Sequence, residues 1–343
     1  MLKILNLTII TLLFSFSSIS NAQTSQATQS FDKLFQTCLF NIIKKTNKDR
    51  TLKEIESYCE KKILKKELGN TEVGVISERM IKEQQSAFNP YVITPHKMNY
   101  ILPISITDSL NKTAYENFSN WDDEIKDIEA KFQLSIKVPL TFGHIFNKSD
   151  QLFFGFTLES WWQLYTEKIS RPFRETNYQP EIFYFTPTKW HPFKTNSALI
   201  IGFEHQSNGR SQLLSRSWNR VYLNFLFEKN NLAVSFRPWY RIPEGDKLSS
   251  ADEVGDDNPD IDVYMGHFEL GVTYDWQKNY QLSMKLRENF SKHKGSIEMG
   301  ITFPLWGKLK GFAQYFSGYG ESLIDYNHKQ QRLSIGLALT EIL

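Results

Sequence analysis

No stretch of about 18 consecutive apolar residues occurs after residue 22 of this sequence. A helix that crosses a bilayer needs about 20 such residues. Lipid cannot form hydrogen bonds with the backbone, so every backbone N–H and C=O group in the membrane must be paired within the protein. A helical membrane protein is therefore excluded. A membrane-spanning β-barrel remains open, because each of its tilted strands needs only about 10 residues, and an aromatic content of 14% agrees with that option.

The sequence also has a small net charge and few cysteines. The net charge is only +2, which gives no indication of a nucleic-acid partner. The two cysteines, Cys38 and Cys59, have no histidines near them in the sequence and cannot supply the four ligands of a structural zinc site.

The N-terminal residues 1–22 have the features of a secretory signal peptide. Lys3 precedes an apolar stretch from Ile4 to Phe16, and small and polar residues follow up to Ala22, where we expect cleavage. The apolar stretch is too short for a spanning helix. Export predicts an oxidising compartment, in which two cysteines are expected to form a disulfide.

Residues 23–95 show helical periodicity. One apolar stripe comprises Phe31, Leu34, Phe35, Cys38, Leu39 and Ile42, and a second comprises Leu52, Ile55, Cys59 and Ile63. Thr51 and Glu54 form a capping box at the start of the second helix. Because Cys38 and Cys59 lie almost symmetrically about the intervening polar turn, we expect a disulfide-linked α-helical hairpin in the periplasm.

After Pro90 the apolar residues recur at every second position, as they do in a β-strand. In residues 131–140 the apolar positions are Phe132, Leu134, Ile136, Val138 and Leu140. Twelve segments of this kind are expected: 96–106, 128–140, 152–164, 178–188, 196–208, 218–229, 232–242, 263–276, 280–291, 294–305, 308–317 and 331–343. A β-sandwich alternates in the same way. The strand lengths, the signal peptide and the inward charges instead favour an all-β, twelve-stranded antiparallel transmembrane β-barrel over residues 96–343.

The connections between these segments alternate in length. Short turns are expected near 228–231 and 277–279, and long loops near 108–127, 165–177 and 243–262. Bacterial outer-membrane barrels have short periplasmic turns and longer external loops. This pattern predicts that both termini lie in the periplasm and that the loop 208–217 opens outward.

Three polar residues share the outward parity of two neighbouring strands. His205 and Ser207 continue the apolar positions Leu199, Ile201 and Phe203, and Asn219 shares the parity of Val221, Leu223, Phe225 and Phe227. A hydroxyl, an imidazole and a carboxamide can form a hydrolase site, with Ser207 as nucleophile, His205 as base and Asn219 as the group that orients the imidazole. The alternative is that these side chains merely meet water at the headgroup level.

Sequence motifs decide between these alternatives. The stretch from His205 reads H-Q-S-N-G-R-S and is followed by S-R-S-W-N-R from Ser215, which closely resembles the signature of the outer-membrane phospholipase A family. Further segments resemble the family in the same order: S-W-W-Q-L from Ser160, P-F-R-E-T-N-Y from Pro172, D-D-N-P-D-I from Asp256 and S-G-Y-G-E-S-L-I-D-Y-N from Ser317. The resemblance covers residues from about 96 to 343.

The resemblance implies a calcium-dependent homodimeric enzyme that hydrolyses acyl esters of phospholipids and lysophospholipids in the outer membrane, with phospholipase A1 and A2 activities. It implies catalytic roles for His205, Ser207 and Asn219. It implies that Ca²⁺ is bound by the carbonyl of Arg210, by Ser215 and by Ser170 of the other subunit. The implied oxyanion hole combines the Ser207 backbone N–H with a calcium-bound water.

The chain also departs from the family pattern. Gln212 stands where relatives can carry an acidic residue, which argues against a second calcium site through Gln212 and Asp257. The hairpin of residues 23–95 has no counterpart in the pattern. The competing hypothesis is a non-catalytic barrel, either a small pore or an adhesin. A pore has no use for His205, Ser207 and Asn219 on its lipid-facing wall.

Overall fold

The computed structural model describes residues 35–44, 55, 58–59, 62, 74–86, 92–116, 121–141, 145–147, 150–247, 249, 255–277, 279–307 and 309–340. The expected signal peptide, residues 1–22, lies outside this part of the chain. None of the described helices is long and apolar enough to cross a membrane.

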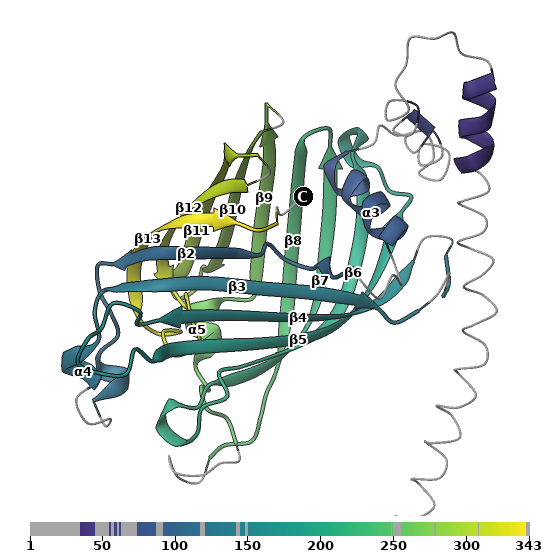
Figure 1. The fold of residues 1–343 in the computed structure, drawn as a ribbon. Coiled ribbons are helices and arrows are strands. Elements are labelled where there is room, and N and C mark those ends of the chain that lie inside the picture. The colour runs from purple at the N-terminus through teal and green to yellow at the C-terminus, as the bar shows by residue number, and fades with distance from the viewer. Residues whose placement is uncertain are drawn as a thin grey trace, which may run out of the picture.

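Twelve antiparallel strands close into a barrel (Figure 1), as the alternation predicted. They are β2 (Tyr100–Thr107), β3 (Ile128–Pro139), β4 (Gln151–Trp162), β5 (Phe173–Thr188), β6 (Asn196–Ser207), β7 (Ser217–Lys229), β8 (Leu232–Ile242), β9 (Phe268–Trp276), β10 (Tyr280–Asn289), β11 (Lys294–Trp306), β12 (Leu309–Tyr319) and β13 (Lys329–Ala338). Each strand pairs with its neighbours in sequence, and the pairing of β13 with β2 closes the ring. The short strand β1 (Thr94–Pro95) is an addition beside β3.

The expected strand 263–276 begins five residues too early, because residues 261–265 form the helix α5 (Ile261–Met265). Ile261 and Met265 are one helical turn apart and are both buried in an aromatic cluster with Trp218 and Trp239. This burial favours a helical turn over an extended strand. The remaining short helices, which lie in the connections, are η1 (Thr113–Tyr115), α4 (Trp121–Glu124), η2 (Pro192–Lys194) and η3 (Gln212–Leu214).

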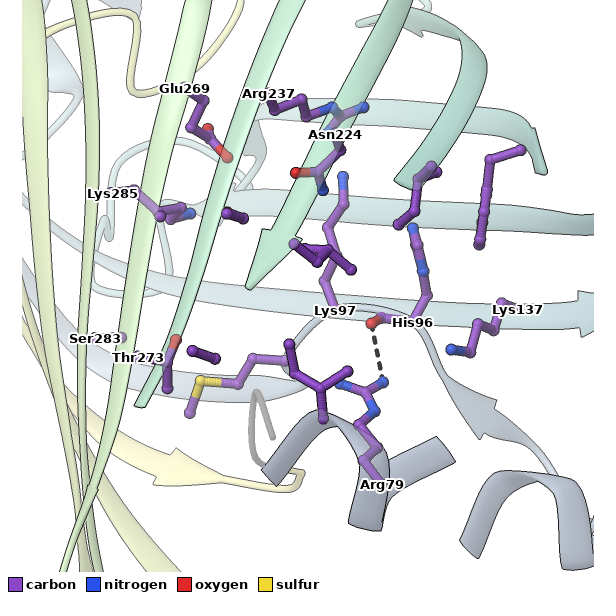
Figure 2. Close-up of a pocket in the computed structure, with 18 of the residues that line it drawn as sticks. Arg79, His96, Lys97, Lys137, Asn224, Arg237, Glu269, Thr273, Ser283 and Lys285 are labelled. Carbon is purple, nitrogen blue, oxygen red and sulfur yellow. Dashed lines mark hydrogen bonds between the residues drawn. The ribbon is translucent and has the colours of Figure 1, made fainter. Parts of the chain in front are cut away.

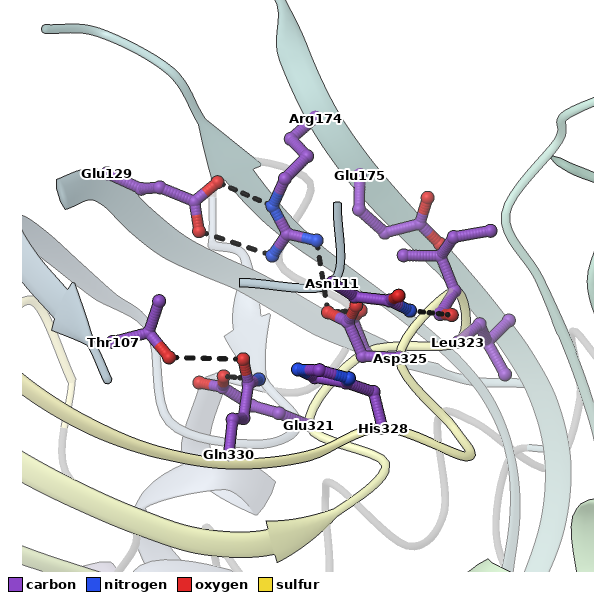
Figure 3. Close-up of polar contacts among 12 residues, drawn as sticks. Thr107, Asn111, Glu129, Arg174, Glu175, Glu321, Leu323, Asp325, His328 and Gln330 are labelled. Carbon is purple, nitrogen blue, oxygen red and sulfur yellow. Dashed lines mark hydrogen bonds and ion pairs between the residues drawn. The ribbon is translucent and has the colours of Figure 1, made fainter. Parts of the chain in front are cut away.

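Paired charges fill the barrel interior near the longer loops (Figure 3). The Arg174 guanidinium lies 2.6 Å from Glu129 and 3.0 Å from Asp325, and the Lys131 ammonium lies 3.0 Å from Glu321. All five side chains are almost fully buried. Removing one partner would leave an uncompensated buried charge and would strongly destabilise the barrel.

The helix α3 (Val75–Ser86) caps the opposite end of the barrel (Figure 1). The Glu228 carboxylate at the end of β7 accepts hydrogen bonds from the backbone N–H groups of Ile76, at 2.7 Å, and Ser77, at 3.0 Å. The first N–H groups of a helix have no partner within the helix, so a carboxylate there stabilises its start.

The body of α3 contacts the barrel interior. Arg79 donates to the carbonyls of Pro95 and His96, and Lys137 pairs with Glu83 at 2.7 Å. Burial raises the pKa of the Glu83 carboxyl, but Lys137 and Arg79 outweigh burial, so the pKa is below its ordinary value. The helix therefore belongs structurally to the barrel, although the sequence analysis grouped it with residues 23–95.

A cavity of about 360 Å³ lies inside the barrel next to α3 (Figure 2). Charged residues of both signs line it, among them Lys97, Arg237, Glu269 and Lys285. None of the three candidate catalytic residues lines this cavity, so the interior is not where the predicted chemistry would take place.

Cys38 and Cys59 form a disulfide with a Cα–Cα distance of 5.7 Å, which confirms the predicted pairing. Cys38 lies in a helix of residues 35–44, and Cys59 is fully buried. The extent of the hairpin and its periplasmic position remain predictions.

Candidate active site

The hairpin of β6 and β7 brings two of the predicted residues face to face. His205 is directly opposite Asn219 in the register, and Ser207 is opposite Ser217. The odd-numbered residues of β6 face outward, as predicted. Phe203 is 43% exposed, whereas the next residue, Glu204, is fully buried inside the barrel.

Asn219 lies within hydrogen-bonding distance of the imidazole. Its Oδ1 is 2.9 Å from His205 Nδ1, so the ring donates from Nδ1 and leaves Nε2 as the basic nitrogen. The Ser207 Oγ accepts a hydrogen bond of 3.1 Å from the backbone N–H of Gly209. No hydrogen bond joins the described side chains of Ser207 and His205. Such contacts are often longer without substrate and shorten in the complex.

Asn208 shapes the loop that follows the serine, a role that the sequence analysis missed. Its side chain is buried, and its Oδ1 accepts hydrogen bonds from the backbone N–H groups of Arg210 and Arg216. Its Nδ2 donates a hydrogen bond of 2.8 Å to the Leu214 carbonyl. Gly209 has a φ of 62°, a conformation that glycine adopts without strain. The N-G pair in the sequence was the available signal for this turn.

Glu244 is the second residue that the sequence analysis missed. Its Oε1 accepts a 2.7 Å hydrogen bond from Asn219 Nδ2, on the side of the amide away from His205. Glu244 lies in the loop after β8, where the strand alternation no longer predicts orientation.

The predicted calcium ligands lie on two loops. Arg210 and Ser215 are in the β6–β7 loop, and the Arg210 side chain donates to the carbonyls of Phe173 and Arg174 on β5. Ser170 is exposed on the β4–β5 loop, and no hydrogen bond of the described residues joins it to Arg210 or Ser215. The predicted set is therefore divided between two loops of the protomer.

The oxygen donors here suit a hard cation in type, since a carbonyl and a hydroxyl are ligands that Ca²⁺ accepts. Ser215 Oγ donates a 2.6 Å hydrogen bond to Asp257, whose carboxylate also pairs with the Lys247 ammonium. Within the described part of the chain, no group of three or more His, Cys, Asp or Glu residues could hold a metal. The described residues therefore offer a cation carbonyl and hydroxyl oxygens here, and no cluster of carboxylates.

The family model described as phospholipase A1 matches residues 76–339. This chain belongs to that family. The phospholipase A1 of Salmonella typhimurium is 38% identical to this phospholipase over 270 residues, which are 78% of this chain and 88% of that protein. The phospholipase A1 of Escherichia coli strain K12 is 37% identical with the same coverage. The matched region includes residues 76–95, which the sequence analysis expected to lack a family counterpart.

Solved structures agree with the family. The Salmonella typhi outer membrane phospholipase, a dimer with bound calcium, is similar with a TM-score of 0.67 and 38% identity, covering 74% of this chain and 94% of that chain. The Escherichia coli outer membrane phospholipase A has a TM-score of 0.67 and 36% identity, covering 74% of this chain and all of that chain. The chain is thus an outer-membrane phospholipase by family and by fold, as its motifs predicted.

Proposed function

We propose that this phospholipase hydrolyses the acyl esters of phospholipids and lysophospholipids, with both A1 and A2 activities, as a calcium-dependent homodimer. Ser207 is the nucleophile, His205 the base and Asn219 the group that orients the imidazole. The observation that supports this proposal most strongly is the 2.9 Å contact between His205 and Asn219, with Ser207 two residues away on the same outward face.

The reaction follows from these roles. The Ser207 hydroxyl attacks the acyl carbonyl carbon as His205 Nε2 takes its proton. The tetrahedral intermediate expels the glycerol oxygen, which receives that proton and leaves as the alcohol. Water, deprotonated by the same nitrogen, then attacks the acyl-serine ester, which releases the fatty acid and restores Ser207. Asn219 holds the ring while its charge changes.

The outer wall supplies a place for the substrate. Ile201, Phe203, Val221 and Leu223 lie on the strands of the catalytic hairpin and are 39–47% exposed. Acyl chains that lie along this apolar wall would present their ester groups near the half-buried Ser207. A non-catalytic pore or adhesin would not need this arrangement, which favours the enzyme over that alternative.

We propose that Ca²⁺ is held by the Arg210 carbonyl and the Ser215 hydroxyl of one subunit, together with Ser170 of the other. When bound, the ion would polarise a water that helps to offset the oxyanion. A second ion at Gln212 and Asp257 is not proposed, because the Asp257 carboxylate is already paired with Lys247.

Calcium dependence can be tested directly. Fatty-acid release from a phospholipid in detergent micelles should fall to near background when EDTA is added, because the set of ligands in one subunit is small and weak. Activity should return with excess Ca²⁺ but not with Mg²⁺, which requires a tighter octahedral site. Full activity in EDTA would contradict the calcium assignment while leaving the three catalytic residues untouched.

The shared site makes a prediction in trans. A subunit carrying Ser207→Ala and a subunit carrying Ser170→Trp should each be nearly inactive as homodimers. In the mixed dimer, the intact Ser207 would belong to the Ser170→Trp subunit and would use the intact Ser170 of the other subunit. Fatty-acid release should therefore recover on mixing. No recovery in isolated mixed dimers would contradict the shared site.

A further inference from the structure

The Asn219 amide is held from both sides. Its Oδ1 lies 2.9 Å from His205 Nδ1, and its Nδ2 donates to Glu244 Oε1 at 2.7 Å. Ile242 is directly across the register from Asn219, and Glu244 follows Ile242 by two residues beyond the end of β8. The carboxylate therefore reaches the amide from the loop after β8, whereas His205 lies on β6.

A primary amide needs such a contact to serve in this role. Its two ends are similar in size, but only the carbonyl oxygen can accept the proton of the imidazole Nδ1–H. With the opposite orientation, the NH₂ group would face Nδ1–H and the ring would lose its acceptor. An ionised carboxylate only accepts hydrogen bonds, so it selects the NH₂ end and repels the carbonyl end.

We propose that Glu244 is a positioning residue of this phospholipase, which fixes the orientation of Asn219 and thereby makes a fourth member of the Ser207, His205 and Asn219 set. This inference rests on the proposed roles of those three residues. Glu244 acts only through Asn219 and does not touch the imidazole.

The simpler alternative is that Glu244 only anchors the loop after β8. A loop anchor would affect folding or substrate affinity, whereas a positioning residue affects the chemical step. The two roles therefore differ in which kinetic constant changes, and in whether the effect depends on Asn219.

The test compares kcat and KM for purified full-length variants with a soluble monomeric or micellar phospholipid. Glu244→Ala should lower kcat by about 10- to 100-fold, the range expected for losing a hydrogen bond to a charged group, with KM within about twofold. Glu244→Gln keeps an oxygen acceptor and should recover most of the loss. Glu244→Lys, which can only donate, should be less active than Glu244→Ala. Asp246→Ala, an exposed acidic residue two positions along the same loop, is the matched control and should behave as wild type.

A double variant isolates the connection to Asn219. If Glu244 acts only through that amide, Asn219→Ala with Glu244→Ala should be no slower than Asn219→Ala alone. A kcat for Glu244→Ala within twofold of wild type, a Glu244→Lys variant as active as Glu244→Gln, or fully additive losses would each overturn the proposal. Ser207→Ala and His205→Ala belong in the same assay. If they stay active the proposed catalytic set is wrong, whereas if only the Glu244 variants stay active the set stands and this inference fails.

Discussion

Replacing Ser207 with alanine should lower kcat by about 10⁴- to 10⁶-fold, because removing a nucleophile disables the whole catalytic unit. The Ser207 hydroxyl has one described hydrogen bond, from the Gly209 N–H, and the side chain is only partly buried. The change should therefore leave the barrel folded. Fatty-acid release measures the activity, and resistance of the folded barrel to unfolding in SDS without heating measures the fold.

The control for this variant lies in the same loop. Ser211 is exposed four residues after the nucleophile and has no proposed role. Ser211→Ala should retain wild-type activity. If Ser207→Ala were within tenfold of wild type, the nucleophile would have to be another residue.

His205→Ala should lower kcat by a similar factor, about 10⁴-fold or more, whereas Asn219→Ala should cost about 10- to 100-fold. The difference follows from the geometry. His205 moves the proton, while Asn219 fixes the ring through a single hydrogen bond of 2.9 Å to Nδ1. Both variants should bind substrate with little change in KM, since neither side chain forms part of the apolar wall.

The order of these two losses is the critical result. A larger loss for Asn219→Ala than for His205→Ala would reverse the assignment of base and orienting residue. Asn224→Ala provides a matched asparagine control, because Asn224 lies on the same strand and lines the interior cavity instead of the outer wall.

Much of the fold follows from the period-two pattern. In a barrel strand with apolar side chains outside and charged side chains inside, successive residues alternate between the two faces. Whether a residue stands at an odd or an even position in the strand therefore predicts which face it occupies. For this reason the parity of His205 and Asn219 sufficed to predict that they share the outer face. The secretory signal and the symmetric placement of Cys38 and Cys59 about a polar turn were enough to predict their disulfide, because exported cysteines meet an oxidising compartment.

The features that could not be predicted lie outside the strands, where apolar and polar residues do not alternate regularly. The residues of α5 continue the alternation of the next strand in sequence, and only the burial of Ile261 and Met265 against distant aromatic residues selects a helix. Glu244 reaches Asn219 from a loop, and Glu228 reaches α3 across about 150 residues of sequence. Such contacts depend on tertiary structure, which local pattern does not specify. The calcium ligands could be predicted only from the family resemblance. One backbone carbonyl and two serine hydroxyls far apart in the sequence form no recognisable metal-binding motif.

Covalent labelling tests the central claim most directly. A fluorophosphonate with a long alkyl chain phosphonylates an activated serine with loss of fluoride, and peptide mass spectrometry identifies the modified residue. The wild-type protein with calcium should carry the adduct on Ser207, and His205→Ala should label at least about 100-fold more slowly, because the serine then lacks its base. An adduct on a different residue, or equal labelling of Ser207 without His205, would contradict a catalytic Ser207 and His205 pair on the outer wall of the barrel.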